Sequence, residues 1–280
     1  MNANDHYLNS ISCLPPVPSL AVELLSFFKK PDRDLDQIVK IISCEPAMTV
    51  ELLRRCNSAY YAVERPTTSV FEALTQLGFY QVYCVVVTLL ASSVTSLPGV
   101  NEGVNVEQLW QHLVTTAIAA SELAEAVGEP KEVAFTAGLL HDIGKLVLAS
   151  AEGSRYSLLQ QEYNGFGTSL LHAEDAAFGV NHASLGGCLL ARWKLPPNIA
   201  TAIILHHNSP EGQPLPTLAA MIGVADLIAH SIVDRNSDWF EEDPSSGPVL
   251  RRLKLGHQDI SSVIAKTKEG LDRTEALMPC

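Results

Sequence analysis

The sequence predicts an all-α fold, and two observations favour it. Apolar residues recur at spacings of three and four along nearly the whole chain, which is the periodicity of a buried helix face. Residues typical of helix starts and stops flank these patterns, and no second strand-like segment is evident to pair with the one Val-rich run. With 280 residues, 47% hydrophobic and 18% charged, the chain can bury one large core or two smaller cores that pack together.

The N-terminal part carries four helical patterns. Apolar periodicity marks residues 20–28 and 35–42, and Pro46 suits the first turn of a third helix. Ser69 and Glu72 have the spacing of a capping box in front of a fourth pattern, which Gly78 fits as a helix stop.

The next segment, 79–96, is rich in Val, and periodicity alone does not distinguish a buried strand from a helix there. We predict a helix because the neighbouring patterns are all helical. The stretch 97–103 contains Pro and Gly and is the clearest break in the chain, so it predicts a domain boundary. Residues 1–100 are therefore expected to form an N-terminal helical bundle.

Helical patterns resume after this break. They lie near 106–127, 131–142, 145–161, 168–177, 182–193, 197–207 and 216–235. We expect 101–235 to form a second helical core. Residues 236–280 are expected to form a loop followed by a helix that starts near Asp259.

Composition excludes several classes of protein. The net charge of −12 makes nucleic acid an unlikely ligand, because such binding depends on Lys and Arg that neutralise phosphates. The longest apolar run, 85–91, is far shorter than the roughly 20 residues that cross a bilayer, and the first residues lack the pattern of a secretory signal. Six scattered cysteines show no CxxC spacing, which argues against a disulfide scaffold or a thiolate metal site. We therefore expect a cytoplasmic protein.

Histidines and aspartates cluster in the second half of the chain. Five of the nine histidines and two aspartates lie in apolar helical patterns: His112, His141, Asp142, His182, His206, His207 and Asp226. Any one of these histidines alone is more simply explained as a buried polar residue with a backbone partner. As a group they suggest a metal site.

The pair His141-Asp142 is the strongest element. It follows a helix that is apolar from 133 to 140, and Gly144 comes directly after. Adjacent residues on a helix point about 100° apart, so both side chains reach one site only near a helix end, which we expect Gly144 to provide. Imidazole nitrogen and carboxylate oxygen suit divalent iron, manganese, zinc or nickel, and a carboxylate can bridge two ions.

These residues resemble a known family. His112, His141-Asp142 and Asp226 reproduce the H…HD…D order of the HD superfamily of metal-dependent phosphohydrolases. Further segments are similar to its HDOD branch (HD-related output domain): 14–19, 42–47, 53–61, 73–78, 181–196 and 202–207. The resemblance covers roughly 14–235 and implies an HD-type helical core with an N-terminal helical bundle.

The resemblance also implies a site of one or two divalent metals. His112, His141, Asp142 and Asp226 would hold a first ion. Asp142 would bridge to a second ion held by His182 and His206, with His207 as an alternative or supporting ligand. In an active enzyme Asp142 and Lys145 would be catalytic, with Lys145 near the substrate phosphate.

Two functions remain open at this stage. The first is a bacterial signal-transduction protein that acts mainly as a binding or output module with a protein partner. The second is an active phosphohydrolase with a nucleotide or phosphate-ester ligand. The chain lacks a Gly-Tyr-Pro signature and has Asn208 where HD-GYP phosphodiesterases carry an acidic residue, which argues against cyclic-dinucleotide hydrolysis.

Overall fold

The computed structural model describes residues 3–10, 19–28, 35–44, 46–57, 66–92, 95, 97–163, 167–207, 215–233 and 246–274. All regular secondary structure in these ranges is helical. No strand occurs in these ranges, so the predicted all-α fold is confirmed. Parts of three motifs of the N-terminal half lie outside the described residues, namely 14–18, residue 45 and 58–61.

The helices run as follows along the chain: α1 (Ala3–Ser10), α2 (Ser19–Phe28), α3 (Leu35–Ser43), α4 (Pro46–Cys56), α5 (Val70–Leu77), α6 (Phe79–Ser92), α7 (Val100–Gly103), α8 (Val106–Val127), α9 (Lys131–Leu140), α10 (Ile143–Glu152), α11 (Ser154–Glu162), α12 (Gly167–Phe178), α13 (His182–Arg192), α14 (Pro197–Leu205), α15 (Thr217–Val233), α17 (Ser246–Leu253) and α18 (His257–Thr274).

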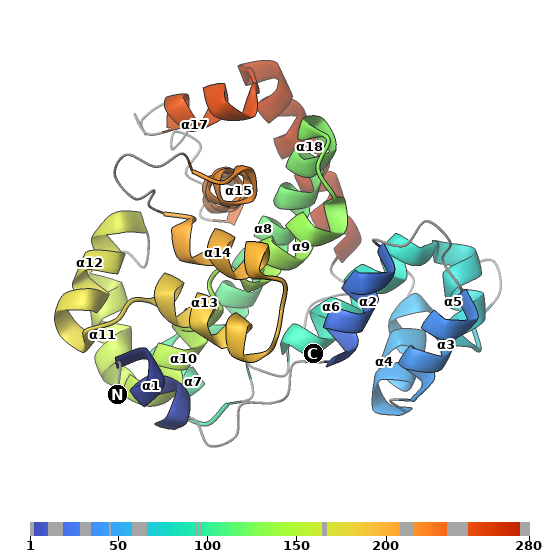
Figure 1. The fold of residues 1–280 in the computed structure, drawn as a ribbon, viewed down its shortest axis with the longest axis horizontal. Helices are drawn as coiled ribbons and strands as arrows, with labels where there is room; N and C mark the ends of the chain where they lie inside the picture. Colours follow the sequence, from blue (N-terminus) through green and yellow to red (C-terminus); the bar gives the residue numbers. More distant parts are fainter. Residues whose placement is uncertain are drawn as a thin grey trace.

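Helices α2 to α6 form the N-terminal bundle, on the right in Figure 1. The Val-rich segment is the helix α6, as predicted, and its residues from Val82 to Val87 are all buried. They are buried because α2, α4 and α5 contact α6 on one side while α9 of the larger core contacts it on another. An unbroken apolar run therefore reflects burial on several faces rather than a strand.

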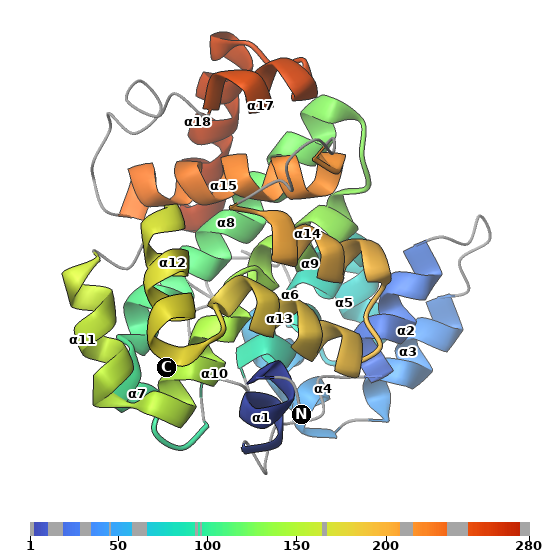
Figure 2. The ribbon, with the colours of Figure 1, turned by 60° about the vertical axis from the view of Figure 1, so that its left-hand side comes forward.

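The larger core is built around α8 and α9. Helix α8 contacts α9, α15 and α18, and a second row of helices joins α10 to α13, α13 to α14 and α14 to α15. Figure 2 shows α13 and α14 lying across α8 and α9. The site described below lies between these two rows.

The predicted boundary near residue 100 stays a prediction, but α1 lies away from the bundle. It contacts α10 and α13, and Figure 1 shows it beside them. The Tyr7 hydroxyl donates to Glu152 Oε1 at 2.6 Å, and Arg192 donates to the backbone oxygen of Leu8 at 3.1 Å. The first described helix thus packs against the larger core.

Several predicted helix limits differ from the structure. The stretch expected as one helix over 145–161 is two, because Gly153 has φ 51° and its N–H donates to Ala149 O, which ends α10. The expected break at 97–103 contains the short helix α7, and the C-terminal part has α17 in addition to the expected last helix. The capping box is confirmed at its start, where Ser69 Oγ accepts the N–H of Glu72.

One described stretch, Lys131–Glu152, has the length and hydropathy of a membrane-crossing segment. Its apolar window is 89% buried inside the protein, and α9 and α10 within it make core contacts with α8 and α13. Burial of this kind is expected for the central helices of a helical domain. The four cysteines in the described part of the chain, Cys44, Cys56, Cys84 and Cys188, are free thiols.

Candidate metal centre

The structure brings all seven predicted ligand side chains together, although they come from five places in the chain. His112 lies on α8 and Asp226 on α15, whereas His182 is the first residue of α13. His141 and Asp142 form the turn between α9 and α10, and the pair His206 and His207 directly follows α14: His112, His141, Asp142, His182, His206, His207 and Asp226. All are buried except His207, which is half-buried.

The expected role of Gly144 as a helix stop is wrong. Helix α9 ends at Leu140, before the pair, and Gly144 lies in the first turn of α10. A Cβ on Gly144 would overlap the backbone oxygen of His182, so the absent side chain lets α10 and α13 approach closely. This approach brings Asp142 next to His182.

His112, His141 and Asp226 form a first donor group. His112 Nε2 lies 3.2 Å from His141 Nε2 and 3.0 Å from Asp226 Oδ1, and His141 Nε2 lies 3.5 Å from the same oxygen. Ligand bonds of about 2.1 Å in octahedral or tetrahedral geometry separate neighbouring donor atoms by about 3.0–3.4 Å. The spacing of these three atoms therefore matches that around one ion.

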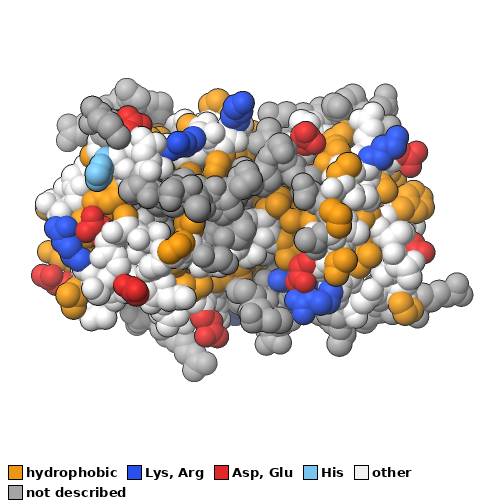
Figure 3. Space-filling model, turned by 90° about the horizontal axis from the view of Figure 1, so that it is seen from below, with side chains coloured by type: hydrophobic (Ala, Val, Ile, Leu, Met, Phe, Trp, Pro, Cys, Tyr) orange, Lys and Arg blue, Asp and Glu red, His pale blue; other side chains and the backbone are white. Residues whose placement is uncertain are grey.

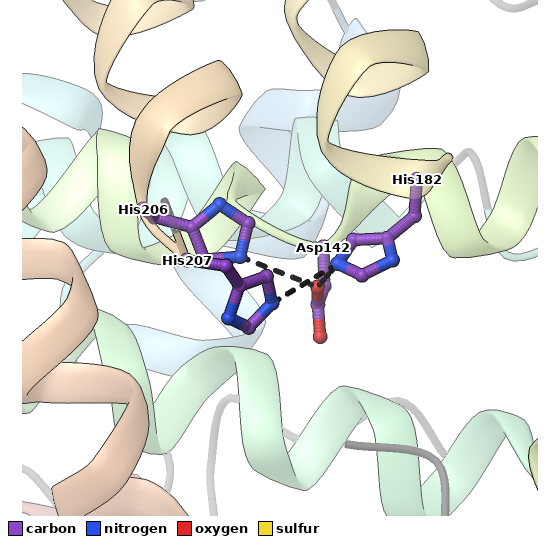
Figure 4. A group of neighbouring side chains, drawn as sticks. All are labelled: Asp142, His182, His206 and His207. Atoms are coloured by element: carbon purple, nitrogen blue, oxygen red, sulfur yellow. Dashed lines mark hydrogen bonds and ion pairs between the residues drawn. The ribbon is translucent and has the colours of Figure 1, made fainter. Parts of the chain in front are cut away.

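Asp142, His182, His206 and His207 form a second group, shown in Figure 4. Asp142 Oδ1 lies 3.2 Å from His182 Nε2 and 3.9 Å from His206 Nε2. His207 Nε2 lies 3.2 Å from His182 Nε2. The donor atoms of this group all fall within 4.8 Å of one another.

Asp142 connects the two groups through its two oxygens. Oδ1 faces the second group, whereas Oδ2 lies 3.3 Å from His141 Nε2 and 3.8 Å from His112 Nε2. A carboxylate that turns one oxygen to each of two donor sets has the geometry of a bridging ligand.

Hydrogen bonds at the far side of three rings fix which nitrogen faces the cluster. His141 Nδ1 donates to Gly138 O at 2.8 Å, and His206 Nδ1 donates to Ile203 O at 2.6 Å. His182 Nδ1 donates to Glu174 Oε2 at 2.7 Å. Because each Nδ1 donates its hydrogen, each ring in its neutral form turns an Nε2 lone pair toward the cluster, which is how metal-binding histidines are held.

Three buried atoms at the centre lack a hydrogen-bond partner: Asp142 Oδ1, His206 Nε2 and Asp226 Oδ1. All three accept rather than donate in the protonation states just described, and buried polar atoms without partners cost free energy. A proton or a metal cation among these converging acceptors would satisfy them. The residues present thus fit a divalent metal.

Burial keeps several of these imidazoles neutral. Burial and the charge of His230 lower the pKa of His112 to about 4, and burial together with His141 lowers the pKa of His206 to about 3. Burial and His206 hold the pKa of His207 well below its usual range. These rings are therefore neutral at pH 7, which is the form that binds metal.

The buried carboxylates of Asp142 and Asp226 are stabilised by positive charge nearby. Burial alone would lower the pKa of His141, but Asp142 and Asp226 together raise it to about 10. Burial would raise the pKa of Asp142, yet His141 and Lys145 hold it well below its usual range. A proton on His141 or a metal cation can supply the charge that these carboxylates require.

Lys145 completes the cluster on the side of the first group. Its Nζ lies 2.7 Å from Asp142 Oδ2, and the side chain is almost fully buried. Burial would lower the pKa of Lys145, but the attraction of Asp142 outweighs it and raises the pKa. The lysine is a fixed positive charge beside the bridging carboxylate.

Sequence reasoning missed two residues of this centre. Glu174 on α12 accepts from both the N–H and Nδ1 of His182, and His230 lies 3.5 Å from Asp226 Oδ1. His230 is four residues after Asp226, so helical spacing alone places both on one face of α15. No comparable signal marks Glu174, because a turn separates it from His182.

A cavity of about 460 Å³ opens beside the first group. His112, Lys145 and His230 line its inner end. Its remaining lining comes from α7, α8, α11 and the end of α15. A small ligand in this cavity would reach the edge of the donor cluster.

The family model of the HDOD domain matches residues 14–209. This chain belongs to the HDOD domain family. The match covers the bundle and most of the larger core, including six of the seven clustered residues. The resemblance to the HDOD family expected from the sequence is thereby confirmed.

Solved structures support the same fold. An HDOD domain protein of unknown function from Geobacter sulfurreducens is 23% identical with a TM-score of 0.77, covering 98% of this chain and 96% of that one. A candidate phosphohydrolase from Shewanella amazonensis SB2B is also 23% identical, with a TM-score of 0.72 and coverage of 97% and 96%. At these identities the likeness establishes the HDOD fold and no activity.

Relatives by sequence are longer proteins. An uncharacterised protein of Treponema pallidum is 29% identical over 206 residues, which are 71% of this chain and 39% of the relative. Ribonuclease Y of Acholeplasma laidlawii is 28% identical over 123 residues, 44% of this chain and 18% of that enzyme. This HDOD chain therefore spans less than half the length of these two relatives.

Proposed function

We propose that this HDOD protein is a signal-transduction module whose His/Asp cluster holds divalent metal ions, and that it acts mainly by binding and output. One observation carries the proposal: Asp142 turns Oδ1 toward His182 and Oδ2 toward His141, at 3.2 and 3.3 Å. Lys145 pairs with Oδ2 at 2.7 Å, but Oδ1 is buried without a hydrogen-bond donor among the described residues, which favours a cation between Oδ1 and the imidazoles.

The residues divide into two ligand sets. His112, His141 and Asp226 would hold one ion together with Asp142 Oδ2. The second ion would be held by Asp142 Oδ1 together with the ring nitrogens of three histidines, His182, His206 and His207. Iron, manganese, zinc and nickel all accept such nitrogen and oxygen donors. When bound, ions of this kind lower the pKa of water and neutralise phosphate charge.

Metal analysis of protein purified without chelator tests this proposal. The chain should carry metal, and Asp142→Ala should lose most of it because both ligand sets lose an oxygen. Asp36→Ala is the matched control, since Asp36 is an exposed carboxylate on α3 of the N-terminal bundle. Full metal content in Asp142→Ala would contradict the assignment of the bridging residue.

The N-terminal bundle supports a role in output to a protein partner. Three of its large hydrophobic side chains are exposed, Leu35 by 42%, Val50 by 67% and Phe71 by 49%. Figure 3 shows hydrophobic side chains gathered on the part of the lower face where this bundle lies. Apolar side chains that form one contiguous exposed patch are typical of surfaces that bind other proteins. We place this module in the cytoplasm, where free thiols such as Cys84 persist.

A second candidate function is hydrolysis of a phosphate ester, favoured by the cavity that reaches His112 and Lys145. Lys145 would bind the phosphate, while Asp142 would hold the ions that activate water. The ribonuclease Y relatives add support for phosphate-ester chemistry. Turnover of nucleotides and phosphodiesters with manganese or ferrous iron, absent in Asp142→Ala, would establish this activity. Partner binding without any turnover would favour the output module alone.

A further inference from the structure

The cavity beside the cluster has a buried end and an open end of different chemistry. His112 and Lys145, at its inner end, are buried. Asn105, Gln108 and Gln161 line it too and are exposed, so they mark its mouth. At about 460 Å³ the cavity falls within the range of roughly 300–1,000 Å³ that is usual for small-molecule sites.

The inner end suits an anionic group. Of the described residues that line the cavity, Lys145 alone carries a formal charge, and that charge is positive. No carboxylate is among the described lining residues, and Asp142 lies behind the lysine at 2.7 Å from its Nζ. A single phosphate group carries about one to two negative charges, which this one cation and metal held by the adjacent cluster would balance together at the same end.

The mouth suits an uncharged, flat, hydrogen-bonding group. Amide side chains from two helices face the cavity, Gln108 from α8 and both Gln160 and Gln161 from α11. Each amide offers a donor and an acceptor, which is the pattern that pairs with the edge of a nucleobase. Val104 and Leu109 supply apolar surface for the faces of a planar ring.

We propose that this cavity binds a nucleoside monophosphate, with its phosphate at Lys145 and its base at Gln108 and Gln161. Charge and apolar surface both limit the ligand. A triphosphate would bring further negative charges for which the described lining residues offer no second cation, and a sugar phosphate would leave the apolar surface of Val104 and Leu109 without a partner. The proposal rests on the proposed function in so far as bound metal strengthens the phosphate end.

Gln108 is the cleanest residue for a test. Gln160 also hydrogen-bonds Tyr156, and Asn105 caps α8 by accepting the N–H of Gln108, so changes there would disturb the fold. Gln108 is exposed and lies on the first turn of α8. Gln111, three residues later on the same helix, is also exposed but does not line the cavity, which makes it a matched control.

The experiment measures binding by calorimetry to the metal-loaded full chain at low temperature. The probes are the four nucleoside 5′-monophosphates, ribose 5-phosphate, adenosine and orthophosphate. At least one monophosphate should bind about tenfold or more tightly than ribose 5-phosphate, as expected for one good base contact. Gln108→Leu should remove most of that difference and leave ribose 5-phosphate binding unchanged, whereas Gln111→Leu should change neither.

Equal binding of ribose 5-phosphate and all four nucleotides, or an unaltered preference in Gln108→Leu, would overturn the proposal. Lys145→Met should weaken every phosphate-bearing probe and leave adenosine unaffected. Metal content is measured on the same samples. Samples that hold metal but show no base preference would contradict only the nucleotide assignment, while samples without metal would contradict the proposed function itself.

Discussion

Glu174 holds His182 with a single carboxylate oxygen. Glu174 Oε2 accepts the backbone N–H of His182 at 2.8 Å and its Nδ1–H at 2.7 Å. The other oxygen, Oε1, accepts the hydroxyl of Tyr156 at 2.7 Å, and all three residues are fully buried. The carboxylate thereby fixes both the start of α13 and the orientation of the His182 ring toward Asp142.

Glu174→Gln should weaken metal binding at the second donor group by about 10- to 100-fold, the usual effect of changing a residue that orients a ligand. A glutamine amide keeps the shape but loses the charge that makes Nδ1 a strong donor. Competition with a chelator of known affinity measures the change. Glu23→Gln, at an exposed carboxylate on α2 of the N-terminal bundle, should have no effect, and an equal loss in both variants would show that the weakening is not specific to His182.

The metal-free protein should be most stable near pH 6.5. The pKa values of His112 and His206 are lowered to about 4 and about 3 by burial, so the unfolded chain binds more protons below pH 6.5. Unfolding free energy should fall there by on the order of 1 kcal/mol per pH unit for each histidine. The raised pKa of His141, about 10, gives stability that is complete below pH 6.5 and is lost as pH rises toward 10.

Urea unfolding of chelator-treated protein between pH 4.5 and 9 measures this profile. His206→Asn should reduce the slope on the acid side and keep the decline on the alkaline side. A stability that rises steadily toward pH 5 would show that these histidines are not held neutral in the fold.

Gly144→Ala should separate α10 from α13. Its Cβ would overlap the backbone oxygen of His182, which cannot rotate away as a side chain could. We expect the unfolding free energy to fall by about 1–3 kcal/mol. We also expect weaker metal binding, because Asp142 would move away from His182. Gly256→Ala is the control, since a Cβ there meets only the Asp259 carboxylate at 3.6 Å. Denaturant unfolding that gives both variants the same stability would contradict this account of the close contact.

The sequence predicted the fold class and the members of the cluster well, for physical reasons. Buried helices carry a strong periodic pattern, and imidazoles and carboxylates in apolar surroundings stand out because they cost free energy unless they have a function. Asp142 was predicted to bridge, and its two oxygens do face different histidines. Its role as a metal ligand stays a prediction.

What the sequence did not reveal depends on contacts between distant segments. Gly144 was predicted to end a helix. In the structure a glycine is required there because the backbone of His182, nearly forty residues away in the chain, leaves no room for a side chain. Glu174 has no helical spacing to His182 because a turn at Gly179, which has φ 72°, separates their two helices. Gly153 likewise ends α10 through a positive φ. The apolar periodicity continues on both sides of this residue, so the sequence pattern did not reveal the break between α10 and α11.

The most direct test of the central claim is diffraction from crystals of the metal-loaded protein at the absorption edge of the bound element. The account predicts two anomalous peaks on either side of Asp142, one about 2.0–2.3 Å from the ring nitrogens of His112 and His141, the other equally close to His182. Crystals of protein carrying stoichiometric metal, with no peak among these residues, would contradict it.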